Sequence, residues 1–237
     1  MTQKPKQTAG GLIRSILFQS TGYRVMLIVF SALGAAMTCA CAFLGAYIGD
    51  EDYFTSVFFL VLAYYLPNFM VLLSFSLMGS SRFLYAAPMA KKAITVGLPL
   101  LGAAICAVQT VLAVGTTAVG LTLGLTDGNR MSDTLAVCAA TSFLLLLCYA
   151  LYQVGGAGFL GLAFGILMFV FSIGTEVTIP GSALDRLCRY GFGLPTWLSA
   201  ILLVAAFAVG IPLSVAIAKK CYRRRSSRAM VGLPPVN

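Results

Sequence analysis

The chain has 237 residues, of which 59% are hydrophobic and 10% are charged, and it carries a net charge of +9. A soluble domain has about 25% charged residues, so this composition, with a mean hydropathy of +0.94, excludes a soluble protein and indicates a single membrane domain. Histidine is absent, which removes the commonest general base and metal ligand and argues against an intramembrane enzyme.

Seven cysteines raise the question of a disulfide framework or a metal site. Five of them lie inside apolar runs, where a small polarizable side chain packs well. We therefore interpret these five as packing residues and expect no metal site and no cofactor: Cys39, Cys41, Cys106, Cys138 and Cys148.

Residues 11–20 are expected to form a short helix on the membrane surface, because their apolar residues recur at helical spacing among basic ones. A cleaved signal peptide is the alternative, since Ala40-Cys41-Ala42 resembles a small-residue cleavage site. The apolar run that contains this tripeptide is about 25 residues long, which is too long for a signal sequence and favours a membrane span.

Six apolar segments are expected to cross the membrane, which predicts an all-α, polytopic membrane protein. Residues 134–173 contain no charge. They are about twice as long as the roughly 20 residues of one crossing, so we divide them into two spans at the glycine-rich residues 153–158. A polar loop is expected at residues 126–133. The predicted spans are residues 25–49, 54–78, 94–118, 134–152, 159–175 and 197–217.

Charge is sorted between the two ends of these spans. Thirteen of the sixteen basic residues lie in the N-terminal segment, in the loop 80–92 or in the tail after residue 217, and none of the seven acidic residues does. Because Lys and Arg are retained on the cytoplasmic side, both termini are expected in the cytoplasm. The tail, with Arg223-Arg224-Arg225, is interpreted as an anchor to anionic lipids, with partner binding as the alternative.

Motifs that would supply energy are missing from the sequence. It contains no G-x-x-x-x-G-K-[ST] phosphate-binding loop, so the chain is not expected to hydrolyse ATP. No acidic residue falls inside a predicted span, which argues against coupling to an ion gradient, and no segment resembles a channel filter. The energy for any transport is therefore expected to come from another protein.

A few polar or helix-perturbing residues interrupt the apolar spans. Pro67-Asn68, beside Tyr64, is typical of a kink whose freed carbonyl the asparagine satisfies, and it is alternatively part of a substrate pathway. Gln109 is expected to make a hydrogen bond between helices rather than a substrate contact. A G-x-x-x-G pair predicts close helix approach in the fifth span. These pathway or packing residues are Tyr64, Pro67, Asn68, Gln109, Gly161 and Gly165.

The loop between the second and third spans is the most informative cytoplasmic feature. Residues 80–92 are amphipathic, and their aromatic and aliphatic side chains suit docking into a groove on a soluble partner. An interfacial helix resting on the membrane is the alternative. The residues expected to carry the contact are Arg82, Phe83, Leu84, Tyr85, Pro88, Met89, Lys91 and Lys92.

On these features the chain resembles the permease subunits of bacterial ABC exporters of the ABC-2 type. The stretch Ala87-Pro88-Met89-Ala90-Lys91-Lys92 is similar to the family's P-[small apolar]-[S/T]-[K/R] stretch before span three, although Ala90 replaces the usual hydroxyl residue. The resemblance implies that this loop carries the coupling helix that inserts into the ATPase. It also implies a partly helical, re-entrant segment between spans five and six, at residues 176–195.

The resemblance further implies a non-catalytic subunit in the bacterial plasma membrane that pairs with a second permease, expected to be a copy of itself. Two separate ATPase subunits would bind ATP and Mg²⁺, and no nucleic acid partner is expected. Compact permeases of this size resemble those of bacteriocin-immunity and phenol-soluble-modulin export systems. The implied substrates are amphipathic or hydrophobic peptides, or lipids or drugs.

Two other functions remain open from the sequence. One is the vitamin-capturing membrane subunit of an energy-coupling-factor importer, which also has about six spans and an external ATPase. The other is an intramembrane enzyme, which the absence of histidine and of acidic residues in the spans argues against. Tight vitamin binding by the isolated chain would distinguish the importer from the exporter.

Overall fold

The computed structural model describes residues 8–48, 53–78, 86–87, 89–125, 128–155 and 193–231, and the regular elements within them are all helices. The prediction of an all-α chain is confirmed for this part of the protein. The elements are α1 (Ala9–Leu17), α2 (Thr21–Ile48), α3 (Tyr53–Met78), α5 (Ala90–Lys92), the π-helix η2 (Ala93–Gly97), α6 (Leu98–Thr122), α7 (Gly128–Gly155) and α10 (Thr196–Val231).

Four of the described helices are long and apolar enough to cross a membrane: Thr21–Ala40, Ala90–Thr122, Arg130–Leu151 and Thr196–Tyr222. They coincide with the predicted first, third, fourth and sixth spans. The predicted second span is helix α3, whose apolar stretch Phe59–Phe75 is shorter. The fifth predicted span, residues 159–175, and the predicted re-entrant segment lie outside the described residues.

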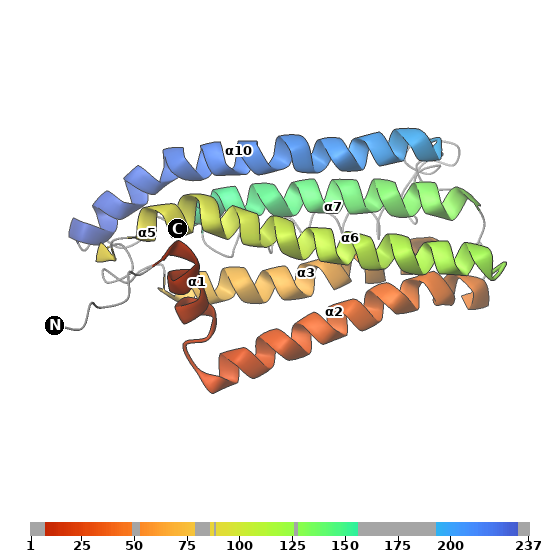
Figure 1. Cartoon of the computed structure of the whole chain (residues 1–237), viewed down its shortest axis with the longest axis horizontal. Helices are drawn as coiled ribbons and strands as arrows, with labels where there is room; N and C mark the ends of the chain where they lie inside the picture. Colours follow the sequence, from red (N-terminus) through yellow and green to blue (C-terminus); the bar gives the residue numbers. More distant parts are fainter. Residues whose placement is uncertain are drawn as a thin grey trace, which may run out of the picture.

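The helices form a bundle in which α2, α3, α6 and α7 run alternately up and down (Figure 1). Helix α10 breaks this alternation because it runs parallel to α7. The hydroxyl oxygens of Ser132 and Ser199, near the starts of α7 and α10, are 2.9 Å apart. Further along, Gly210 of α10 faces Leu146 of α7. Two neighbouring helices therefore start at the same end of the bundle.

Helix α1 confirms the predicted N-terminal helix and lies across one end of the bundle (Figure 1). The side chain of Thr8 caps it by accepting a 3.1 Å hydrogen bond from the amide of Gly11. Its buried residues Leu12, Ile16 and Leu17 pack in the main hydrophobic core, and the helix contacts α3, α5 and η2. Its apolar face is therefore used for packing within the chain.

The third span begins earlier than predicted. Residues 80–92 were expected to be a loop, but helix starts at Ala90 and continues through α5, η2 and α6 to Thr122. Ala90 and Ala93 are completely buried, so burial of their small side chains favours helix over loop at this position. The wider turn of η2 lies where this helix meets α1.

The fourth span also begins earlier than predicted, and it contains an acid. Most of the expected polar loop 126–133 is the start of α7, which begins at Gly128. Asp133 lies inside the membrane-length segment Arg130–Leu151 and is only 8% exposed. The prediction that Asp133 lies in a loop was therefore wrong. A carboxylate one turn inside a helix start faces the positive end of the helix dipole, which favours this position.

Two helix ends are explained by local chemistry. Helix α6 ends because Gly124 adopts a positive φ of 68°, and the amides of Gly124 and Leu125 donate to the carbonyls of Leu121 and Gly120. Helix α10, in contrast, continues far beyond its predicted end at residue 217. Its 36 residues give a length of about 54 Å, against roughly 30 Å for the hydrocarbon core of a bilayer. The basic tail is therefore an extension of the last helix.

Large apolar side chains cover the outer faces of the bundle. Those of α2, α6 and α10 are more than half exposed at several positions, as is typical of a surface that meets lipid. The interior is filled by aromatic and branched side chains that are less than 2% exposed, including Tyr64, Leu72, Phe75, Leu98 and Tyr149. The exposed set includes Val25, Ile28, Val108, Val111, Ile201 and Val204.

Candidate functional site: a buried polar network

Asn68 lies at the centre of a polar network between α3, α6 and α7. Its side chain is completely buried. The phenol of Tyr149 donates a 2.8 Å hydrogen bond to Asn68 Oδ1. The amide nitrogen of Asn68 donates to the carbonyl of Tyr64 at 2.7 Å and lies 3.9 Å from Cys106 Sγ. Asn68 therefore bonds its own helix and two neighbouring helices, which satisfies an amide that apolar surroundings would otherwise penalise.

Tyr64 extends the network along α6. Its hydroxyl oxygen is 2.7 Å from Thr110 Oγ1, and both residues are buried. Thr110 donates its single proton to the carbonyl of Cys106 at 2.8 Å. It must therefore accept from Tyr64, which fixes the proton of the tyrosine on the Thr110 side. One turn of α6, from Cys106 to Thr110, thus provides partners to both Tyr64 and Asn68.

A second pair, next to the first, joins α2 to α6. The hydroxyl of Thr38 donates to Gln109 Oε1 at 2.9 Å, and both side chains are less than 5% exposed. Gln109 precedes Thr110, so consecutive residues of α6 bond α2 and α3. This confirms the prediction that Gln109 makes a hydrogen bond between helices.

Pro67 and Gly34 allow α2 to approach α3 closely at this level. Pro67 has no amide proton, so the carbonyl of Ala63 lacks its usual helical donor. A Cβ atom on Gly34 would lie 2.7 Å from that carbonyl oxygen and 3.2 Å from Gln109 Nε2. Only glycine therefore fits here without moving a backbone. The asparagine beside the proline bonds the carbonyl of Tyr64 and not the freed one.

The network consists of neutral hydroxyl, amide and thiol groups. No group of three or more His, Cys, Asp or Glu side chains that could hold a metal ion occurs among the described residues. The arrangement therefore offers neither a general base nor a metal ligand set. The hydrogen bonds of the network connect four helices, α2, α3, α6 and α7. They fix the position of each helix along its neighbours, because each donor has an acceptor on a particular turn of the next helix.

The described part of the predicted coupling segment lies at the start of the continuous helix Ala90–Thr122, whose middle carries Gln109 and Thr110 of the network. Met89 precedes the first turn and is half-buried, whereas Lys91 and Lys92 are exposed on that turn. The structure therefore places these two lysines on the extended third-span helix and not in a loop. Five residues of the segment lie outside the described residues: Arg82, Phe83, Leu84, Tyr85 and Pro88.

Helix α1 packs on η2, which directly follows these lysines in the same helix. Gly97, the last residue of η2, lies under Ile13 of α1, and a Cβ on Gly97 would come 2.5 Å from Ile13 Cδ1. Arg24, at the start of α2, donates from Nη2 to the carbonyl of Phe18 at 3.3 Å and lies over the Phe18 ring. The segment after α1 is thus attached to the start of the first span.

Sequence reasoning identified part of the network. Tyr64, Pro67, Asn68 and Gln109 come together, while Gly161 and Gly165 lie outside the described residues. The partners on the other helices were missed, and Cys106 was interpreted only as packing. A hydroxyl in an apolar span was the signal for three of these partners, because such groups need an acceptor in hydrocarbon. The missed partners are Thr38, Cys106, Thr110 and Tyr149.

Comparison of the chain with protein-family models, with curated proteins and with solved structures found no match.

Proposed function

We propose that the chain is the permease subunit of an ATP-driven ABC exporter of the ABC-2 type. It would form a homodimer in the bacterial plasma membrane, with two separate ATPase subunits on the cytoplasmic side. Its substrates would be amphipathic or hydrophobic peptides, or lipids or drugs. The proposal includes six spans, with residues 159–175 as the fifth.

The parallel packing of α7 and α10 supports the fifth span. Both helices are long enough to cross a membrane, and both start at the same end of the bundle. Helix α7 therefore ends at one end of the bundle, and α10 starts at the other. This arrangement supports the proposed fifth span between them, with which the chain would have six spans and both termini on one side.

The distribution of charge supports a cytoplasmic location for the end that carries α1. Exposed basic side chains occur there on four helices, whereas the opposite end contains Arg130 and Asp133 among the described charged residues. Lys and Arg near the ends of spans are retained in the cytoplasm. The exposed basic residues are Arg14, Arg24, Lys91, Lys92, Lys219 and Lys220.

The uninterrupted helix from Ala90 to Thr122 is the single observation that carries the proposal. At one end it presents Lys91 and Lys92, and near its middle it contains Gln109 and Thr110 of the polar network. A partner that moves the first turn would therefore move the network through a stiff element. A two-state response to ATP needs a direct mechanical connection of this kind.

The test measures ATP turnover by the complex of this chain with a candidate ABC ATPase subunit from the same organism, reconstituted in vesicles. The double variant Lys91→Glu/Lys92→Glu is expected to lower the affinity of the ATPase by at least about tenfold, because each lost charge contact contributes about 1 kcal/mol or more. The matched control is Lys219→Glu/Lys220→Glu, which reverses the same charges at the same end on α10. Failure to co-purify with the ATPase, together with unchanged turnover in the first variant, would contradict the proposal.

The vitamin-importer alternative gains no support from the described cavity. A vitamin carries polar ring atoms or carboxylates that need hydrogen-bond partners, whereas the cavity between α7 and α10 is lined by hydrocarbon side chains. Vitamin binding by the isolated chain at submicromolar concentration would restore that alternative.

A further inference from the structure

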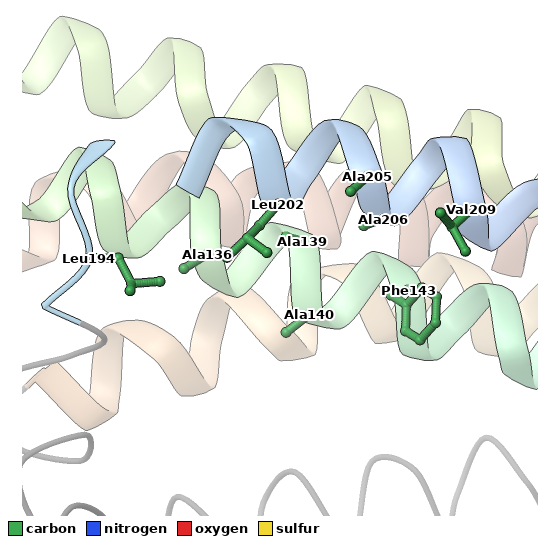
Figure 2. Close-up of a pocket in the computed structure, with 9 residues that line it drawn as sticks. All are labelled: Ala136, Ala139, Ala140, Phe143, Leu194, Leu202, Ala205, Ala206 and Val209. Atoms are coloured by element: carbon green, nitrogen blue, oxygen red, sulfur yellow. The ribbon is translucent and has the colours of Figure 1, made fainter. Parts of the chain in front are cut away.

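A cavity of about 360 Å³ lies between α7 and α10 (Figure 2). Its volume is in the lower part of the range of about 300–1,000 Å³ that is usual for ligand pockets. The floor is made by three buried alanines, Ala136 and Ala139 of α7 and Ala206 of α10. These side chains are too small to fill the space between the helices. Beyond the cavity the two helices pack closely, for example where Gly210 faces Leu146.

The cavity opens on the outer face of the bundle. Its rim includes Leu202 and Val209 of α10, which are 43% and 55% exposed, and the exposed Ala140 of α7. These residues lie inside the two membrane-length segments Arg130–Leu151 and Thr196–Tyr222. In a bilayer the opening would therefore meet hydrocarbon and not water.

The chemistry of the lining selects the occupant. The side chains that line the cavity are all alanine, leucine, valine or phenylalanine, and they offer no hydrogen-bond donor or acceptor. A peptide backbone or a sugar placed there would lose several kcal/mol per unsatisfied polar group, whereas an alkyl chain loses none. An alkyl chain is the ligand class that fits such a lining.

One end of the cavity lies next to two buried serines that do not line it. Leu194 lines this end (Figure 2). Its carbonyl accepts a hydrogen bond from the hydroxyl of Ser132, which is also bonded to Ser199. Arg130 and Asp133 lie on the same turn of α7 as Ser132. From that end the cavity extends along α7 as far as Phe143, about 10 Å beyond Ala136 and a third of the roughly 30 Å hydrocarbon core.

We propose that this cavity binds the hydrocarbon chain of a single-chain amphiphile whose head group lies at the Ser132–Ser199 end. The hydrocarbon lining takes the chain, and the head group lies outside the cavity, at the end of the bundle where α7 and α10 start. The small volume admits one chain. The site needs no ATPase, so it is independent of the export function proposed above.

The test is photolabelling of the full-length chain in nanodiscs with a lysophosphatidylcholine that carries a diazirine in its C16 chain. Mass spectrometry of the labelled peptides is expected to place the label on α7 and α10 around Ala139 and Ala206. Ala206→Phe fills the cavity and should lower this labelling by at least about tenfold, equivalent to about 1.4 kcal/mol of binding free energy. The matched control Val204→Phe, on the exposed face of α10, should leave labelling within about twofold.

A second variant tests the cavity after folding. Ala205→Cys is purified and then alkylated with a bulky maleimide, which should reduce labelling as strongly as Ala206→Phe does. Excess unlabelled lysophosphatidylcholine should displace the probe, whereas a diacyl phospholipid should not. Equal displacement by both lipids, labelling spread evenly over the exposed faces of α2 and α6, or disulfide formation between two copies through Ala205→Cys would overturn the proposal.

Discussion

Tyr149 of α7 and Asn68 of α3 are joined by a 2.8 Å hydrogen bond between two completely buried side chains. The donor and the acceptor are 81 positions apart in the sequence and belong to two different predicted spans. This bond fixes the register of α3 and α7 at this level of the bundle. Its loss is therefore the most direct measure of what the network contributes.

Tyr149→Phe is expected to lower the free energy of unfolding by about 1 kcal/mol, because Asn68 Oδ1 loses its donor while the ring remains. A double-mutant cycle with Asn68→Ala should give a coupling energy of about 0.6 kcal/mol, the usual size for such bonds in membrane proteins. Unfolding in mixed detergent micelles provides the measurement. Tyr23→Phe, at the start of α2, is the control and should have no effect; a coupling energy of zero would contradict the bond.

Gly102→Ala is expected to destabilise the chain by about 1–3 kcal/mol, because the new methyl group would overlap the edge of the Tyr149 ring, at 2.8 Å from its Cζ. The measurement is again unfolding in mixed micelles. Shortening the ring should relieve this clash, so the double variant Gly102→Ala/Tyr149→Leu should be more stable than the sum of the single effects. Simple additivity of the two changes would show that they do not share this contact.

Gly34→Ala is expected to separate α2 from α3, because the added Cβ meets the backbone oxygen of Ala63 at 2.7 Å. A backbone oxygen cannot swing aside, so a loss of about 1–3 kcal/mol follows. Crosslinking between cysteines placed on α2 and α3 should fall in parallel. Gly115→Ala on α6 is the matched control: nothing lies within 4 Å of its Cβ position, so a change toward higher stability, up to about 1 kcal/mol, is expected.

Sidedness can be measured with single cysteines in a background that lacks the seven native ones. Lys219→Cys, at the basic end, should react with a membrane-impermeant maleimide only after the cells are permeabilised. Leu125→Cys, next to the glycine that ends α6 at the other end, is 40% exposed and should react in intact cells. The reverse pattern would invert the proposed orientation.

The sequence predicted the helices well because apolar length is a local property. Five of the six predicted spans fall on described helices, and α1 lies where amphipathic spacing placed it. The span starts were less accurate. Ala90 and Asp133 were assigned to loops because lysine or acidic residues were taken as membrane boundaries, whereas helix continues through both positions. Charge marks the depth of a residue in a bilayer and not the end of its helix.

Only some residues of the network could be predicted, and their partners could not. Asn68 and Gln109 were recognised as polar residues that need partners, but a single sequence gives no information on which turn of which helix supplies them. Cysteine is common in apolar packing, so nothing in the local pattern of Cys106 distinguished it, whereas the hydroxyl of Tyr149 signalled the need for a partner without saying which. Their roles depend on the distance between helices, which Gly34 and Gly102 set by their lack of a side chain.

The parallel arrangement of α7 and α10 has a consequence for the order of assembly. Antiparallel neighbours such as α2 and α3 can enter a membrane together as a hairpin soon after they are made. Helices α7 and α10 are the most extensively packed pair in the described chain, yet they are separated by 40 residues and begin at the same end. Their interface forms only after α10 has been synthesised and inserted, so the face of α7 that packs on α10 meets lipid until then.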